Sequence, residues 1–461
     1  MKETFPTHRT PMRNPTQAEE AKDELPEIAL QQEMREGYKY THDSALAWYL
    51  AVTVAPPREE LTTEKTAEML LAQKHEVPYL ASAVLERTCN LSCPHCLYQD
   101  EKSSAGLSKA AHLDETIKNI VQQMPIRTAP GENGLGEYAP QFMSAGRILR
   151  PNHLPLFADL RAMRPDVGLG VIDNGTFTKL LSRWPEGFKF DWMDISIDGP
   201  EAVHNTQRDD EHAFRDAING LQQARSVVRD SEEGGYVSSL FTLTNLNAGT
   251  VQETADLLLE NRGGRPLVDK FNMTTLSPTN PVNAQMRGSV DDFARAWEGM
   301  RAVSDKYNSG IDYEDKPFRF NLYRTDDIEK LADAIGAEKV LRAFRKEGDV
   351  RLKRNMLTTS IDGVPVMYLP LSIWTPEEFL IEADGAYRTA YEGMFTMNEL
   401  RTGVSADGRD TRPYTVEQLT PESDFRAAYE HGVDHYWTKF GKARMSEEME
   451  TWRRIREKAG E

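Results

Sequence analysis

Short apolar runs rich in β-branched and aliphatic residues alternate with helical patterns through the middle of this chain, and this alternation limits the folds open to it. Six such runs cover residues 77–86, 141–146, 167–175, 190–199, 235–245 and 267–278. Helical patterns lie between them at 154–163, 213–228 and 250–261. Strands that alternate with helices favour a parallel sheet. The sequence therefore predicts an α/β fold, either a βα barrel or an ordinary doubly wound sheet.

All the cysteines of the chain, Cys89, Cys93 and Cys96, lie within eight positions in the sequence CNLSCPHC, directly after the first predicted strand. Chemistry in βα barrels gathers at the carboxyl ends of the strands, where this loop would lie. A disulfide would leave one thiol over. A structural zinc site needs four ligands, and His95, the neighbour of Cys96, is a poorly placed fourth one. An iron–sulfur cluster held at C-x3-C-x2-C would leave one iron without a protein ligand.

The sequence CNLSCPHC resembles the C-x3-C-x-aromatic-C motif of radical S-adenosylmethionine (radical SAM) enzymes, with His95 in the aromatic position. The resemblance implies one 4Fe–4S cluster held by the three cysteines. It also implies that SAM chelates the open iron and is cleaved to a 5′-deoxyadenosyl radical. The fold that it implies is a partial (βα)6 barrel over residues 77–285.

The stretch ISIDGPEAVHNTQR (195–208) is similar to the fourth-strand pattern of the sulfatase-maturing and peptide-modifying (SPASM-twitch) branch. The resemblance implies that Ser196 touches the ribose or carboxylate of SAM and that Arg208 pairs with the carboxylate. A planar guanidinium suits a bidentate contact to a carboxylate. The alternative is that Ser196 caps a strand end and Arg208 is a surface charge.

The stretch DNGTF (173–177) resembles the Thr-Asn-Gly-Thr of the third strand, with Asp173 in place of threonine. The resemblance places Asn174 near the adenosine, although Asn-Gly also suits a tight turn with no ligand.

After the second strand the sequence departs from the Gly-Gly-Glu of the family, because Ala145, Gly146 and Arg147 occupy those positions. Gly146 still allows the backbone to approach a cofactor closely. Arg147 cannot accept hydrogen bonds from the SAM ammonium, so the Ser144 hydroxyl or a main-chain carbonyl would have to do so. Arg147 would alternatively face an acidic substrate.

The regions beside the predicted barrel are expected to be extensions. Residues 1–76 predict a mainly helical N-terminal extension, and residues 286–355 predict a helical segment. Residues 356–461 resemble a twitch-like C-terminal extension, with a hairpin around the turn EADG, helices and no cluster cysteines. The expected fold is thus a partial (βα)6 radical SAM barrel with a helical N-terminal and an α+β C-terminal extension.

The lack of a fourth cysteine limits the chemistry that the resemblance implies. It excludes an auxiliary cluster with thiolate ligands, a cysteine that quenches a product radical, and methyl transfer through a methylated cysteine. Hydrogen abstraction followed by rearrangement, elimination, decarboxylation or carbon–carbon bond formation remains, as does an oxidation that returns its electron to the cluster. The sequence identifies no catalytic residue, and any of 16 tyrosines is a candidate hydrogen donor.

The composition and charge of the chain limit the kinds of molecule that it is expected to bind. The net charge of −18 disfavours nucleic acid and anionic lipid as partners. No apolar run suits a membrane span or a signal peptide, so a cytoplasmic protein is expected. The expected substrate is a small polar metabolite of natural-product biosynthesis, and the expected electron donor is a flavodoxin or ferredoxin-type protein. A peptide substrate and a non-enzymatic scaffold stapled by metal are the alternatives.

Overall fold

A computed structural model of the chain describes a series of ranges that together contain most of the predicted barrel. They are residues 80–85, 89–96, 111–124, 140–144, 149–261, 264–276, 281–345, 351–353, 356–368, 378–381, 387–388, 419–429 and 442–461. The expected N-terminal extension lies outside these ranges. No helix in the described ranges is both long enough and apolar enough to cross a membrane.

Six parallel strands in sequence order form the centre of the sheet. They are β1 (Leu80–Ala83), β2 (Gln141–Ser144), β3 (Gly168–Asp173), β4 (Trp192–Ser196), β5 (Tyr236–Leu243) and β6 (Lys270–Thr275). Each lies inside one of the six predicted runs, because apolar side chains on alternate positions of these runs pack under helices. The carboxyl ends of all six strands meet at one edge of the sheet.

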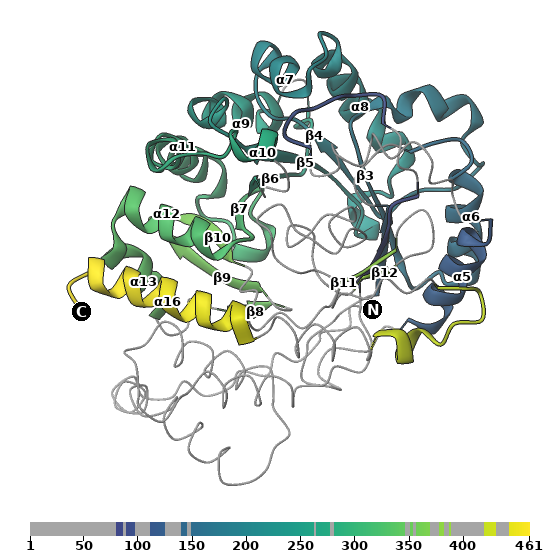
Figure 1. Cartoon of the computed structure of the whole chain (residues 1–461). Coiled ribbons are helices and arrows are strands. Elements are labelled where there is room, and N and C mark those ends of the chain that lie inside the picture. Colours follow the sequence, from purple (N-terminus) through teal and green to yellow (C-terminus); the bar gives the residue numbers. More distant parts are fainter. Residues whose placement is uncertain are drawn as a thin grey trace, which may run out of the picture.

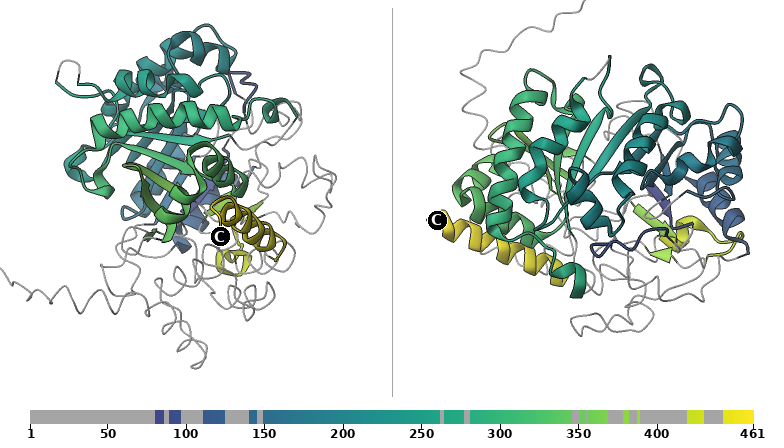
Figure 2. Two further views of the ribbon diagram at one scale, coloured as in Figure 1. Left: turned by 90° about the vertical axis from the view of Figure 1, so that its left-hand side faces the viewer. Right: turned by 90° about the horizontal axis from the view of Figure 1, so that it is seen from above.

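Helices cover the outer side of the curved sheet, as Figures 1 and 2 show. After β1 they are α5 (Leu113–Gln123), α6 (Leu154–Met163), the 3₁₀ helix η3 (Thr176–Arg183), α7 (Glu201–Arg208), α8 (Ala213–Val227), the short η4 (Ser231–Glu233) and η5 (Ala248–Thr250), and α9 (Val251–Leu259). The three predicted helical patterns correspond to α6, α8 and α9. A single apolar core fills the space between these helices and the sheet.

The sheet continues beyond the six strands on both sides, giving twelve strands within the described ranges. Beside β6 the order is β7 (Phe318–Leu322), β10 (Val364–Tyr368), β9 (Met356–Ile361) and β8 (Arg351–Lys353). Beside β1 it is β11 (Glu378–Ile381) and β12 (Tyr387–Arg388). The antiparallel pair β11–β12 flanks the predicted turn EADG, whose own residues lie outside the described ranges.

The segment 286–355 contains strands as well as the expected helices. After α10 (Pro281–Ala284), helix α11 (Val290–Val303) begins at a capping box between Ser289 and Asp292 and continues into the π-turn η6 (Ser304–Asn308). The 3₁₀ turn η7 (Tyr313–Asp315) then leads into β7, which pairs in parallel with β6. Two further helices of this segment, α12 (Thr325–Ile335) and α13 (Ala337–Arg345), are separated at Gly336.

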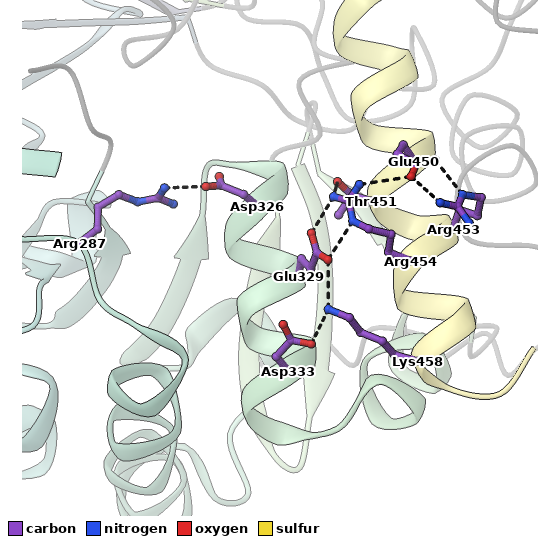
Figure 3. Close-up of polar contacts among 9 residues, drawn as sticks. All are labelled: Arg287, Asp326, Glu329, Asp333, Glu450, Thr451, Arg453, Arg454 and Lys458. Atoms are coloured by element: carbon purple, nitrogen blue, oxygen red, sulfur yellow. Dashed lines mark hydrogen bonds and ion pairs between the residues drawn. The ribbon is translucent and has the colours of Figure 1, made fainter. Parts of the chain in front are cut away.

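The C-terminal helix α16 (Lys442–Lys458) packs against α12 and α13 (Figures 1 and 3). Trp452 is fully buried and meets the rings of Phe344 and Tyr368 edge-on. Arg454 forms two hydrogen bonds with Glu329, at 2.9 and 2.7 Å. The end of the chain is thereby fixed to the extended side of the sheet.

Candidate cofactor site

The three cysteines lie on a compact loop that follows β1. None of the three forms a disulfide bond, and Cys93 is buried while Cys89 and Cys96 are half-buried. The Cys96 amide donates to the Cys93 carbonyl at 3.1 Å, and the Leu91 amide points at the Cys89 sulfur from 3.5 Å. A backbone amide directed at a sulfur stabilises the thiolate form that binds iron.

His95 holds this loop against α7. Its ring is 6% exposed, with Nδ1 2.9 Å from the carbonyl oxygen of Gln207 and Nε2 3.6 Å from Asp198 Oδ2. Both ring nitrogens thus face protein acceptors. This arrangement does not favour His95 as the fourth ligand of a zinc ion, which was one interpretation of the sequence.

Arg208, the last residue of α7, lies beside the cysteine loop. Its Nε and Nη2 are each 2.6 Å from Asp198 Oδ2, and its side chain also hydrogen-bonds Cys93. Burial disfavours the charge, but Asp198 and Cys93 outweigh burial and raise the pKa of Arg208 above its ordinary value. Arg208 is therefore an enclosed cation within the site and not the surface charge of the alternative interpretation.

Asp198 is the site residue that the sequence reasoning passed over, although it stands inside the quoted stretch ISIDG. It is fully buried after β4, and its Oδ1 accepts the Thr242 amide of β5 at 2.9 Å. Burial opposes ionisation, yet Arg208, then His95 and His204, hold the pKa of Asp198 below its usual value. Asp198 therefore joins β4, β5, α7 and the cysteine loop as a buried anion.

Asn174 connects the end of β3 to the same loop. Its Nδ2 donates to Asn90 Oδ1 at 2.9 Å, and its Oδ1 accepts from the Thr176 hydroxyl at 2.7 Å. Gly175 has a φ of 93°, a conformation that glycine adopts without strain. Asn174–Gly175 is thus a tight turn that also contacts the cysteine loop through Asn90, and the contact of Asn174 with the adenosine stays a prediction.

Asp173 shapes the neighbouring connection. Its carboxylate accepts the backbone amides of Leu149 at 2.8 Å and Gly175 at 2.7 Å. One side chain therefore joins the stretch after β2 to the turn after β3. Gly146, like Ala145 and Arg147, lies outside the described ranges, so its expected role stays a prediction.

The two serines expected at the site lie on different faces of the sheet. Ser196 of β4 alternates with Met193 and Ile195, which belong to the core beneath the helices, so Ser196 lies on the opposite, concave face. Ser144 of β2 shares the helix-side face of Phe142 and is 6% exposed. Ser196 is thus better placed than Ser144 to meet a ligand inside the curve of the sheet.

The donor chemistry suits an iron–sulfur cluster, because three thiols share one loop with a sulfur-directed amide and an enclosed guanidinium. The three sulfurs do not converge on one point in this structure, since no group of three or more His, Cys, Asp or Glu side chains in the described parts of the chain is arranged to hold a metal ion.

No protein-family model matches the sequence. The chain is 29% identical over 219 residues to pre-heme d1 synthase of Dinoroseobacter shibae, a match that covers 47% of this chain. The chain spans about half the length of this curated relative, since the match covers 48% of it.

Solved structures with a similar arrangement are more distant in sequence. SuiB of Streptococcus suis is 11% identical, with a TM-score of 0.46 over 90% of this chain and 77% of SuiB. The anSMEcpe structure with bound AdoMet and the Cp18Cys peptide is 14% identical, with a TM-score of 0.37 over 79% of this chain and 98% of that one.

The cysteine motif on its loop after β1 and the similarity to pre-heme d1 synthase support the assignment to the radical SAM superfamily of enzymes. The fold agrees, because the six central strands form the curved parallel sheet that the family resemblance implies.

Proposed function

We propose that the chain binds one 4Fe–4S cluster through Cys89, Cys93 and Cys96, and that SAM completes the coordination of the open iron. The observation that carries the proposal is the loop with three cysteines at the carboxyl edge of the parallel strands, next to Asn174 and Arg208. When bound, the cluster and SAM supply a one-electron cleavage that yields methionine and a 5′-deoxyadenosyl radical, which then takes a hydrogen atom from the substrate.

The protein's own residues would position the cofactors and keep water out. The three thiolates hold the cluster, while His95 keeps the loop in place through Gln207. Asn174 and Ser196 are proposed to contact SAM from the ends of β3 and β4, with Gly146 as a proposed contact after β2. The Ser144 side chain faces the helices, so it is not placed to make the contact that the sequence suggested. Burial of Cys93 and His95 limits the access of water and oxygen.

We propose a small polar metabolite as the substrate. Ser196 of β4, Thr242 of β5 and Thr274 of β6 lie on the concave face toward the carboxyl ends of these strands, since they alternate with core residues under the helices. Such polar side chains suit a polar ligand better than an apolar one.

The name of pre-heme d1 synthase supports a biosynthetic role on a small molecule rather than on a peptide. A flavodoxin or ferredoxin-type protein is the proposed electron donor. The reaction would proceed by hydrogen abstraction followed by rearrangement, elimination, decarboxylation or carbon–carbon bond formation.

The test is anaerobic incubation of the reconstituted protein with SAM and dithionite, followed by chromatography of the products. We expect 5′-deoxyadenosine and methionine in equal amounts from the parent, and neither from Cys93→Ala. Ser309→Ala, a substitution in the turn after η6, serves as the matched control and should retain cleavage. Cleavage by Cys93→Ala at the parent's rate would refute the assigned ligand set.

A further inference from the structure

Arg208 contacts two protein side chains among the described residues. Its Nε and Nη2 both face Asp198 Oδ2 at 2.6 Å, and the side chain hydrogen-bonds Cys93. The family resemblance implies a pair between this arginine and the carboxylate of SAM. The guanidinium also lies against a proposed cluster ligand.

Asp198 fixes this orientation from within the fold. Its Oδ1 is held by the Thr242 amide of β5 at 2.9 Å, and its own amide donates to His204 Nδ1 at 3.0 Å. The Asp198 side chain is fully buried and that of Arg208 is 12% exposed, so solvent screens the pair weakly. Because Asp198 is held in place by these contacts, its ion pair restricts the orientation of the Arg208 guanidinium.

We propose that Asp198 is a positioning residue that directs Arg208 onto Cys93, and that the Asp198–Arg208 pair sets the reduction potential of the cluster before SAM binds. This inference rests on the proposed function, because it requires the cluster. Hydrogen bonds to the cysteine sulfurs and nearby charges change the reduction potential of an iron–sulfur cluster.

The pair predicts shifts of opposite sign for its two members. Reduction adds one negative charge to the cluster, and a nearby cation favours that state. Arg208→Met removes the cation and the hydrogen bond to Cys93, so the potential should fall. Asp198→Asn leaves the buried cation without its counter-charge, so the potential should rise. In the double variant both charges are absent, and the potential should lie between those of the two single variants.

The experiment is a redox titration of the reconstituted protein without SAM, followed by electron paramagnetic resonance (EPR). Arg225→Met is the matched control. Arg225 forms a similar pair with Asp269, at 2.7 and 2.8 Å, but Asp269 precedes β6 at the opposite edge of the sheet from the cysteines. This control should leave the potential unchanged. A structural role alone would not give opposite signs for Arg208→Met and Asp198→Asn.

The sign of the shift in reduction potential tests the inference in each single variant separately. If one variant fails to fold, the other still tests it. Unchanged potentials with weakened SAM binding in Arg208→Met would overturn the inference and favour the carboxylate pair. Shifts of the same sign in both variants would also overturn it. A parent protein that assembles no 4Fe–4S cluster would instead refute the proposed function, which this titration detects before any variant is compared.

Discussion

Asn174 Nδ2 donates to Asn90 Oδ1 at 2.9 Å, which joins the turn after β3 to the cysteine loop after β1. The position of Asn174 depends in turn on α8, because Gly220 of that helix packs directly on Gly175. An added Cβ at Gly220 would lie 2.6 Å from the Gly175 Cα, closer than real contacts of this kind. The glycine pair therefore sets how near α8 lies to the site.

Gly220→Ala should displace this turn and loosen the connection to the cysteine loop. Overpacking of this kind costs about 1–3 kcal/mol of folding stability. We expect a lower midpoint in urea unfolding and less iron retained after gel filtration. Gly249→Ala is the matched control, since a Cβ there would meet nothing within 4 Å. Equal iron retention in the two variants would contradict the role of the glycine pair.

His204→Asn should reduce the acid sensitivity of the fold. Burial, followed by the charge of Arg208, lowers the pKa of His204 from 6.5 to about 3, so the folded state binds fewer protons than the unfolded state. The free energy of unfolding should therefore decrease as the pH falls from 6.5 toward 3, by about 1.4 kcal/mol per pH unit from this group.

The measurement is urea unfolding of metal-free protein at several pH values between 7 and 4. In the parent, His204 Nδ1 accepts a hydrogen bond from the Asp198 amide at 3.0 Å. The asparagine side chain keeps an acceptor for this amide, but it does not titrate. The parent should lose stability more steeply than the variant as the pH falls. The exposed His212 offers the control His212→Asn, which should keep the parent's slope. If the free energy of unfolding changed with pH equally in the parent and in His204→Asn, His204 would have the same pKa in the folded and unfolded states, which contradicts the prediction.

Trp452→Ala should detach the C-terminal helix from the sheet extension. The indole is fully buried against Phe344 and Tyr368, and loss of such a side chain costs about 3–5 kcal/mol. Its neighbour Arg453 pairs only with Glu450 (Figure 3) and Glu457 among the described residues, both on the same helix. Arg453→Ala is therefore the matched control. We expect a large drop in thermal midpoint for Trp452→Ala and little change for the control.

The central strands were predictable because their apolar positions are local in sequence. Runs such as 235–245 carry alternating residues, β5 lies inside that run, and it packs against α8. Strand β7 was missed, although Phe318, Phe320 and Leu322 alternate in the same way, because the surrounding charged helical patterns dominated the interpretation of 286–355. The pairing of β11 with β1 joins residues about three hundred positions apart, which no local pattern reveals.

The sequence predicted the site residues that belong to a recognisable motif. It did not predict which side chains contact one another, because those contacts depend on the tertiary structure. The spacing of Cys89, Cys93 and Cys96 identified the loop. The sequence did not show that Asp198 would hold Arg208 and face His95, because those contacts bring together three separate elements of the fold. The stretch ISIDG held the signal, since an aspartate at a strand's carboxyl end commonly lies in a βα active site.

The most direct test of the account is the metal content of anaerobically reconstituted protein, measured together with its response to SAM. A 4Fe–4S cluster with three protein thiolates predicts about four irons and four sulfides per chain. The EPR signal of the reduced protein should change when SAM is added and should be absent in Cys93→Ala. About eight irons per chain would show a second cluster with ligands other than cysteine. Stoichiometric zinc in protein purified without oxygen, with no cleavage of SAM, would contradict the central claim.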